Sequence, residues 1–127
     1  MQLETRRLVL RPWREADYQD LYEYACSPLV GPQAGWPVHE SAEESREIAR
    51  GFAEEKRDLI LALEHKQDAK VIGSIGLHDR QVSLAYERLA SREMGYVLNP
   101  KYWGQGLMSE AAMCILEYGF YQMGLDM

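Results

Sequence analysis

Residues 93–112, with the sequence EMGYVLNPKYWGQGLMSEAA, constrain the fold of this chain more than any other segment. The first six of them predict a strand that ends at Asn99-Pro100, and apolar residues between about Gly106 and Met123 recur with helical spacing. A strand joined to a helix through glycines is typical of an anion site, because the first-turn N–H groups lack internal acceptors. A pyrophosphate would fit there, although a tight turn explains the glycines equally well.

The glycines do not complete either of two common nucleotide-binding motifs. The chain contains no Gly-Lys-Ser or Gly-Lys-Thr, so a Walker A loop is excluded. The dinucleotide fingerprint is matched only in part, by Gly104, Gly106 and Ser109. Asp126 lies where that fingerprint needs an acidic residue, but no strand pattern precedes it.

The remaining sequence alternates between strand and helix patterns. Pro12 closes the first strand because it cannot donate to a neighbour, and Ser41 with Glu44 matches a capping box at the start of a helix. The predicted elements are strands over residues 8–11, 59–64 and 71–77, the last two as a hairpin near the sheet centre, and helices over about 14–27 and 42–56. The order β-α-α-β-β-β-α predicts one α+β domain over residues 1–127, with a mostly antiparallel central sheet and helices on both faces.

Helical spacing also assigns buried faces. The first helix is expected to bury Tyr18, Leu21, Tyr22 and Ala25, and the second Ser45, Ile48, Ala49 and Phe52. The last helix is expected to be largely buried through Ala112, Ile115, Leu116 and Gly119, widened by Met108, Ala111 and Tyr118. Within the hairpin, Gly73 and Gly76 indicate a bulge or a close approach of another backbone.

Composition narrows the class of partner. The chain has 127 residues, of which 46% are apolar, and a net charge of −6, so it can form a globular core but offers no basic stripe for nucleic acid. No apolar run approaches the ~18 residues of a transmembrane helix, and the N-terminus lacks a signal-peptide core. We therefore expect a cytoplasmic protein that contacts neither nucleic acid nor membrane.

The cysteines and histidines give no sign of a metal site. Cys26 and Cys114 are isolated in the sequence and are expected to be small packing residues in a reducing compartment. His39, His65 and His78 lack ligand spacing among themselves or with the cysteines, and we expect them on the surface.

Three segments, in family order, resemble the GNAT acetyltransferase superfamily. They are RRLVLRP at residues 6–12, VIGSIG at 71–76, and EMGYVLNP at 93–100 followed by WGQGLMSEA at 103–111. Within the superfamily the chain is similar to the RimJ/RimL type, the ribosomal-protein N-terminal acetyltransferases. The resemblance implies a GNAT-like fold, acetyl-CoA as cosubstrate, no metal, and direct acetyl transfer to a primary amine, either a protein N-terminal α-amine or a small-molecule amine.

The resemblance also implies roles for individual residues. The family's phosphate-loop motif falls on Lys101, Gly104 and Gly106, with lysine in place of the usual glutamine or arginine. The backbone amides expected to hold phosphate are those of Trp103, Gly104, Gln105, Gly106, Leu107, Met108 and Ser109. Tyr96, Val97 and Leu98 match the strand positions whose backbone pairs with the pantetheine arm.

Two further residues are candidates on the acceptor side. Glu93 is a candidate general base acting through water, with a solvated carboxylate or one paired with Arg92 or Arg88 as the alternative. Trp36 lies in the region that shapes the acceptor site in the family, and packing as a core or lid residue is its alternative.

Two other functions fit the same residues: a catalytically impaired module for binding or assembly, and a nucleotide-binding protein that uses the glycine loop. Family members normally continue with a strand, a helix carrying the leaving-group acid, and a hairpin. We therefore expect a C-terminally truncated sequence in which that strand would begin near Leu125. An unpaired sheet edge would then favour completion by another chain, for example as a homodimer.

Overall fold

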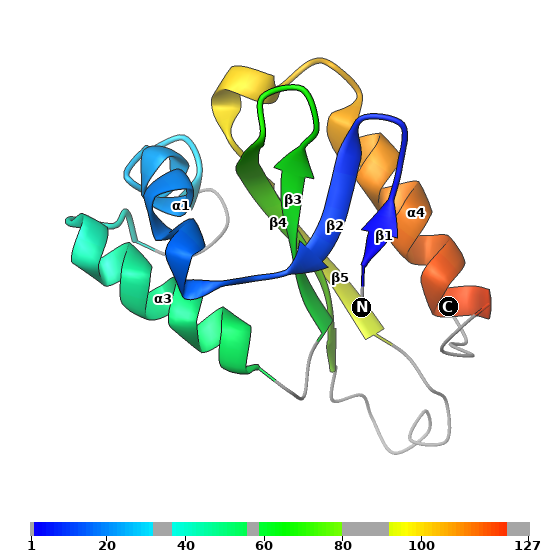
Figure 1. The fold of residues 1–127 in the computed structure, drawn as a ribbon, viewed down its shortest axis with the longest axis horizontal. Helices are drawn as coiled ribbons and strands as arrows, with labels where there is room; N and C mark the ends of the chain where they lie inside the picture. Colours follow the sequence, from blue (N-terminus) through cyan, green and yellow to red (C-terminus); the bar gives the residue numbers. More distant parts are fainter. Residues whose placement is uncertain (1, 32–36, 56–58, 80–91, 122–127) are drawn as a thin grey trace.

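The computed structural model describes residues 2–31, 37–55, 59–79 and 92–121 (Figure 1). An antiparallel five-stranded sheet has the order β1-β2-β3-β4-β5, which confirms the predicted fold class. The strands are β1 (Leu3–Glu4), β2 (Leu8–Pro12), β3 (Leu59–His65), β4 (Lys70–Asp79) and β5 (Arg92–Leu98). The helices are η1 (Glu15–Asp17), α1 (Tyr18–Ala25), α3 (Ala42–Glu54), η3 (Pro100–Tyr102) and α4 (Leu107–Tyr121). The two-residue β1 was not predicted.

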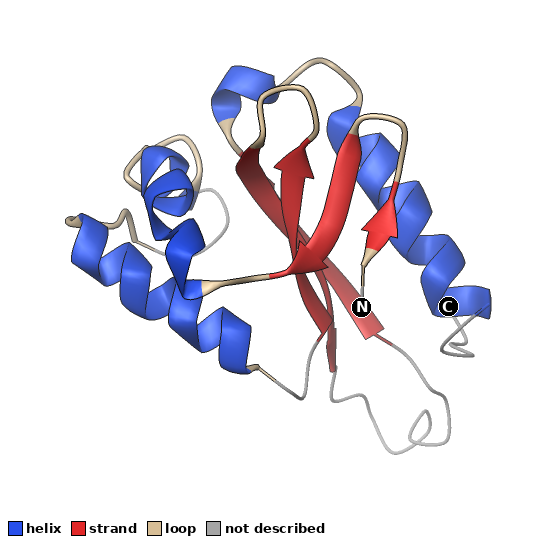
Figure 2. Cartoon of the chain, viewed as in Figure 1, coloured by secondary structure: helices blue, strands red, loops and turns tan. Residues whose placement is uncertain are grey.

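The sheet separates two helical layers (Figure 2). Helices α1 and α3 lie on one face, and α4 crosses the other. Because side chains alternate along a strand, Leu61 and Leu63 of β3 pack into the cluster that contains α4, and Ala62 between them packs into the cluster of α1 and α3. This two-sided burial explains why β3 and β4 have nearly continuous apolar sequences.

The buried helix faces differ in part from those predicted. In α1 the buried residues are Leu21, Tyr24 and Ala25, so Tyr24 takes the inward position expected for Tyr22. Ser45 and Ala49 of α3 are buried as predicted and Phe52 is partly buried against the same cluster, whereas Ile48 is 39% exposed. The capping box is confirmed in part: the Ser41 hydroxyl accepts from the Glu44 amide at 3.2 Å.

One stripe of α4 is buried rather than most of its surface. Leu107, Ala111 and Ile115 are at most 1% exposed and pack against β2, β3 and β4. Met113, on the opposite side of the helix, is 61% exposed. The predicted apolar face is therefore buried or half-buried where the structure describes it, whereas the opposite side of the helix is exposed, since one sheet face covers only one side of it.

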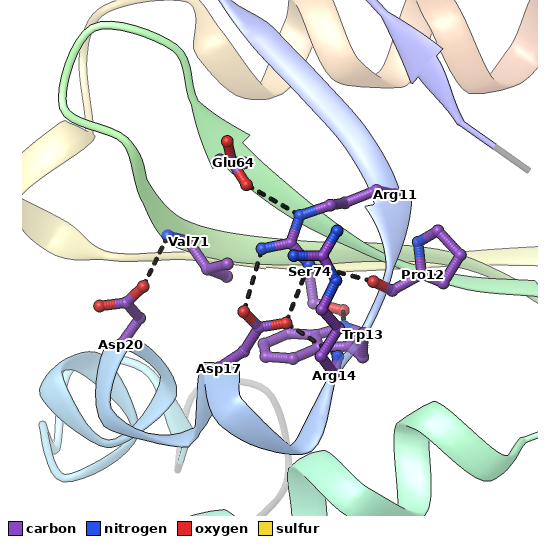
Figure 3. Close-up of polar contacts among 9 residues, drawn as sticks. All are labelled: Arg11, Pro12, Trp13, Arg14, Asp17, Asp20, Glu64, Val71 and Ser74. Carbon is purple, nitrogen blue, oxygen red and sulfur yellow. Dashed lines mark hydrogen bonds and ion pairs between the residues drawn. The ribbon is translucent and has the colours of Figure 1, made fainter.

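Gly73 confirms the predicted close approach. A Cβ atom on Gly73 would stand 2.4 Å from the backbone oxygen of Val97 in β5. The β3–β4 register shifts between Leu63 and Glu64, which places a bulge at this point of β4. Beside the bulge, the Val71 amide donates to the Asp20 carboxylate of α1 at 2.9 Å (Figure 3).

Arg11 carries a second polar link, between the sheet and η1, which leads directly into α1. Its guanidinium donates to both carboxylate oxygens of Asp17, at 2.9 and 3.0 Å, and to Glu64 at 2.8 Å (Figure 3). The Arg11 and Asp17 side chains are only 7% and 9% exposed. The hydrogen bond to Asp17 raises the pKa of Arg11 despite the opposing effect of burial, so the guanidinium stays charged.

Two of the three histidines and one cysteine lie elsewhere than predicted, and the exposure of His78 is outside what the structure describes. His39 and His65 are buried rather than on the surface, since His39 Nδ1 lies 2.7 Å from the Ser45 hydroxyl and His65 Nδ1 accepts from the Asp68 amide at 3.2 Å. Burial lowers the pKa of His39. Cys26 is exposed and so is not the packing residue expected, while Cys114 is half-buried.

Within the described ranges, no cluster of histidine, cysteine and acidic residues could hold a metal ion. None of the helices described combines the length and apolar character that a membrane-spanning segment needs. Residues 80–91, Trp36 and the strand expected near Leu125 lie outside the described residues.

Candidate functional site

The site begins where Asn99 turns the chain out of β5. The Asn99 amide donates to Ile72 of β4 at 2.7 Å, and its side-chain oxygen accepts from the Lys101 amide at 3.0 Å, which starts η3. Its side-chain nitrogen donates to Glu23 of α1 at 2.7 Å. Hydrogen bonds from Lys70 and Asn99 lower the pKa of Glu23 although burial opposes them. This fully buried asparagine therefore ties β5, η3 and α1 together behind the loop.

Tyr102 holds the other end of η3. Its hydroxyl donates to Asp68 in the β3–β4 turn, and its ring lies 5.2 Å from that of His65. The hydrogen bond to Asp68 raises the pKa of Tyr102 to about 12, so the phenol stays protonated at neutral pH. The segment leading into the glycine loop is thus anchored at both ends.

The glycine loop has the backbone conformation that its sequence requires. Gly104 and Gly106 have φ angles of +79° and +77°, in a region that other residues rarely adopt. The Trp103 amide donates to Pro100 at 3.2 Å and is not free for a ligand. The Glu110 amide donates to the Gly106 carbonyl at 3.1 Å and so begins the hydrogen-bonding pattern of α4. The N–H groups of Leu107, Met108 and Ser109 precede that bond and have no acceptor within the helix.

β5 is an edge strand of the described sheet, and its backbone polar groups alternate in direction. The Asn99 amide and the Val97 carbonyl face β4, as the Asn99–Ile72 bond and the closeness of Gly73 to Val97 show. The N–H and C=O groups of Tyr96 and Leu98 therefore point to the open edge. The Trp103 indole confirms this direction, because its Nε1 donates to the Leu98 carbonyl at 2.8 Å.

A cavity of about 760 Å³ lies between this open edge and the start of α4. This volume is in the range of small-molecule sites. Tyr96, Val97, Leu98, Trp103, Gly104, Gly106, Leu107, Met108 and Ser109 line it. The structure therefore brings together nine of the ten residues predicted for cofactor binding; Gln105 is the exception.

The other residues predicted for the site, where the structure describes them, are not among those that line the cavity. Glu93 lies in β5 opposite His78 of β4. Lys101 is 74% exposed, its Nζ lies 4.0 Å from Glu23, and it is not among the residues that line the cavity. Trp36 lies outside the described residues, and no role in acceptor binding is assigned to it.

Sequence reasoning missed two parts of the site. Leu29 and Val30, which follow α1, also line the cavity, and nothing in their sequence indicates a distant loop as neighbour. Arg7 and Glu110 form an ion pair at 2.9 Å beside the glycine loop. Both belong to segments quoted for the family resemblance, but residues 103 positions apart cannot be paired from one sequence.

The sequence model of one protein family, the acetyltransferase (GNAT) domain, matches residues 7–127 of this chain. The chain belongs to the GNAT acetyltransferase family.

Individual relatives agree with this assignment. The uncharacterized N-acetyltransferases YoaA and YnaD of Bacillus subtilis (strain 168) are 31% and 34% identical over 127 residues, which cover 98% of this chain and 69% of each relative. The crystal structure of a GNAT-family acetyltransferase from Bacillus anthracis has a TM-score of 0.82 and 26% identity, over 98% of this chain and 69% of that one.

Proposed function

We propose that this chain binds acetyl-CoA in the cavity between β5 and the start of α4 and transfers the acetyl group to a primary amine. The observation that carries the proposal is that two kinds of unsatisfied backbone group border one cavity. The first-turn N–H groups of α4 suit a pyrophosphate, and the open edge at Tyr96 and Leu98 suits an extended amide-containing arm. No metal is needed for either contact.

The Leu98 carbonyl is already occupied by the Trp103 indole. An arm that pairs with β5 would therefore use Tyr96 and the Leu98 N–H, while Val97 contributes to the wall without offering backbone groups. The apolar lining residues, such as Leu107 and Met108, fit the aliphatic part of the same ligand.

The transfer requires a neutral amine, whose nitrogen attacks the thioester carbon. The carbon–sulfur bond then breaks, the new ammonium loses a proton and the thiolate gains one. Glu93 is our candidate for accepting the ammonium proton through water, on the grounds of its place at the start of β5 and the family resemblance. The acceptor we propose is that of the RimJ/RimL type, a protein N-terminal α-amine, with a small-molecule amine as the alternative.

Calorimetry with CoA tests the binding step. We expect the folded wild-type protein to bind CoA at ligand concentrations up to about 1 mM, the weak end of specific binding. Gly106→Glu should abolish binding, because a glutamate is strained at the φ of +77° that this loop position requires and its carboxylate adds negative charge beside a phosphate site. Gly51→Glu is a matched control, since it adds the same charge on α3, where a Cβ at Gly51 meets nothing within 4 Å.

Folding of each variant is checked by its melting temperature. Absence of CoA binding by folded wild-type protein, or equal binding by both glutamate variants, overturns the proposal. Release of the CoA thiol from acetyl-CoA, measured with N-terminal peptides and with small amines, then tests acetyl transfer and identifies the acceptor class.

A further inference from the structure

The turn between β1 and β2 lies against the start of α4. The Thr5 amide donates to the Leu8 carbonyl at 2.9 Å, and the Leu8 amide donates to the Thr5 hydroxyl at 3.0 Å, so the turn is closed from both sides. This rigid turn presents Arg7 to Glu110, which lies in the first turn of α4.

Glu110 accepts three hydrogen bonds from this turn. The Arg7 amide and the Arg7 Nε each donate at 2.9 Å, and the Thr5 hydroxyl donates as well. Burial alone would raise the pKa of Glu110, but these bonds outweigh it and the pKa lies below its ordinary value. The carboxylate is therefore ionised at neutral pH, and Arg7 compensates its charge.

The guanidinium also reaches the glycine loop. Arg7 Nη1 donates to the Gln105 carbonyl at 3.0 Å, and a Cβ on Gly106 would stand 3.7 Å from Arg7 Nη2. In a trans peptide the carbonyl and the following N–H point to opposite sides. Because Arg7 holds the Gln105 carbonyl, the Gly106 N–H points away from Arg7, and Gly106 lines the cavity whereas Arg7 does not.

We propose that Arg7 is a positioning residue, which orients the Gln105–Gly106 peptide so that the Gly106 N–H faces a bound phosphate. The proposal rests on the proposed function of the cavity. The Arg7–Glu110 pair adds no net charge, so attraction for phosphate is left to the loop and to the helix N-terminus. Without Arg7, the peptide can turn and the Glu110 carboxylate would repel the ligand.

Calorimetry with CoA on Arg7→Met and Arg7→Lys tests this role. Arg7→Met should bind CoA at least about 10-fold more weakly than wild type, equal to ~1.4 kcal/mol. Arg7→Lys should fall between the two, because one ammonium can pair with Glu110 but cannot hold the Gln105 carbonyl in the same geometry.

Lys66→Met is the matched control. Lys66 Nζ donates to the Thr5 carbonyl at 2.7 Å and lies 3.2 Å from Glu4, so it ties down the same turn without contacting the loop. We expect its melting temperature to fall about as much as that of Arg7→Met, with CoA affinity within about twofold of wild type. A role confined to the stability of the turn would instead change affinity equally in both variants.

Amide hydrogen exchange in the ligand-free protein gives an independent readout. The amides of residues 104–109 should exchange faster in Arg7→Met than in wild type or Lys66→Met. If wild-type protein fails to bind CoA, the proposed function is lost and exchange alone decides whether Arg7 orders the loop. Unchanged exchange in Arg7→Met, or full CoA affinity in either Arg7 variant, overturns the proposal.

Discussion

Two arginines near opposite ends of strand β2 each pair with a carboxylate, but the two ion pairs have different roles. Arg11, at the end of β2 near α1, is 7% exposed and binds Asp17 through both carboxylate oxygens. Arg7, just before β2, is 40% exposed and divides its donors between Glu110 and the glycine loop. Burial makes loss of one partner costly in the first pair, whereas exposure of Arg7 lets the second pair shape a binding loop at little cost in stability.

The largest difference we expect is between the losses of stability caused by replacing each arginine. Arg11→Met is expected to lower the free energy of unfolding by about 3–5 kcal/mol, because Asp17 is left as a buried charge without its partner. Arg7→Met should cost at most about 1 kcal/mol, since the Arg7 side chain is 40% exposed and its ion pair is screened by water. Chemical denaturation measures both values.

A second replacement sharpens the test. Combining Arg11→Met with Asp17→Leu should recover part of the loss, because the buried carboxylate is removed with its partner. The distinction between the two arginines would fail if Arg11→Met cost no more than Arg7→Met.

A substitution at Gly73 tests how closely β4 and β5 pack in the sheet between the two arginine sites. Gly73→Ala would place a methyl group 2.4 Å from the Val97 oxygen, a backbone atom that cannot rotate away. We expect a loss of about 1–3 kcal/mol as β4 and β5 move apart. Gly51→Ala in α3 meets nothing within 4 Å and should stabilise the protein by up to about 1 kcal/mol. A neutral Gly73→Ala measured by denaturation would contradict the tight β4–β5 contact.

Local patterns predicted most of the elements in this fold. The alternation of strands and helices, the Ser41 cap and the strand-loop-helix of residues 93–112 each depend on neighbouring residues, and the structure confirms them. Two-residue β1 has too few residues for a pattern. It is placed by pairing with β2, which no local signal specifies.

Features that depend on distant partners could not be predicted. Ile48 has the helical spacing of a core residue, but the sheet and α1 contact the smaller Ala49 instead. His65 is buried because the Asp68 amide and the Tyr102 ring surround it, and both contacts arise from how β3, β4 and η3 fold together. The Arg7–Glu110 pair is of the same kind, since only the folded sheet brings the first turn to the last helix.

The smallest effect we expect is a pH-dependent one, at Glu110. Its pKa is lowered in the folded state, so its contribution to stability is present at neutral pH and is lost as the pH falls below the ordinary value of 4.5. Glu110→Gln should therefore melt a few degrees below wild type at about pH 7, a difference of at most about 1 kcal/mol, and the gap should close as the pH falls through the lowered pKa of Glu110. Lys66→Met, which leaves Glu110 and its partners in place, should keep the same pH dependence as wild type. If the difference in melting temperature between wild type and Glu110→Gln stays constant over this pH range, the charge of Glu110 does not contribute, and Arg7 and Thr5 hold the side chain by shape. The contrast with the charge-dependent Arg11 site would then be larger.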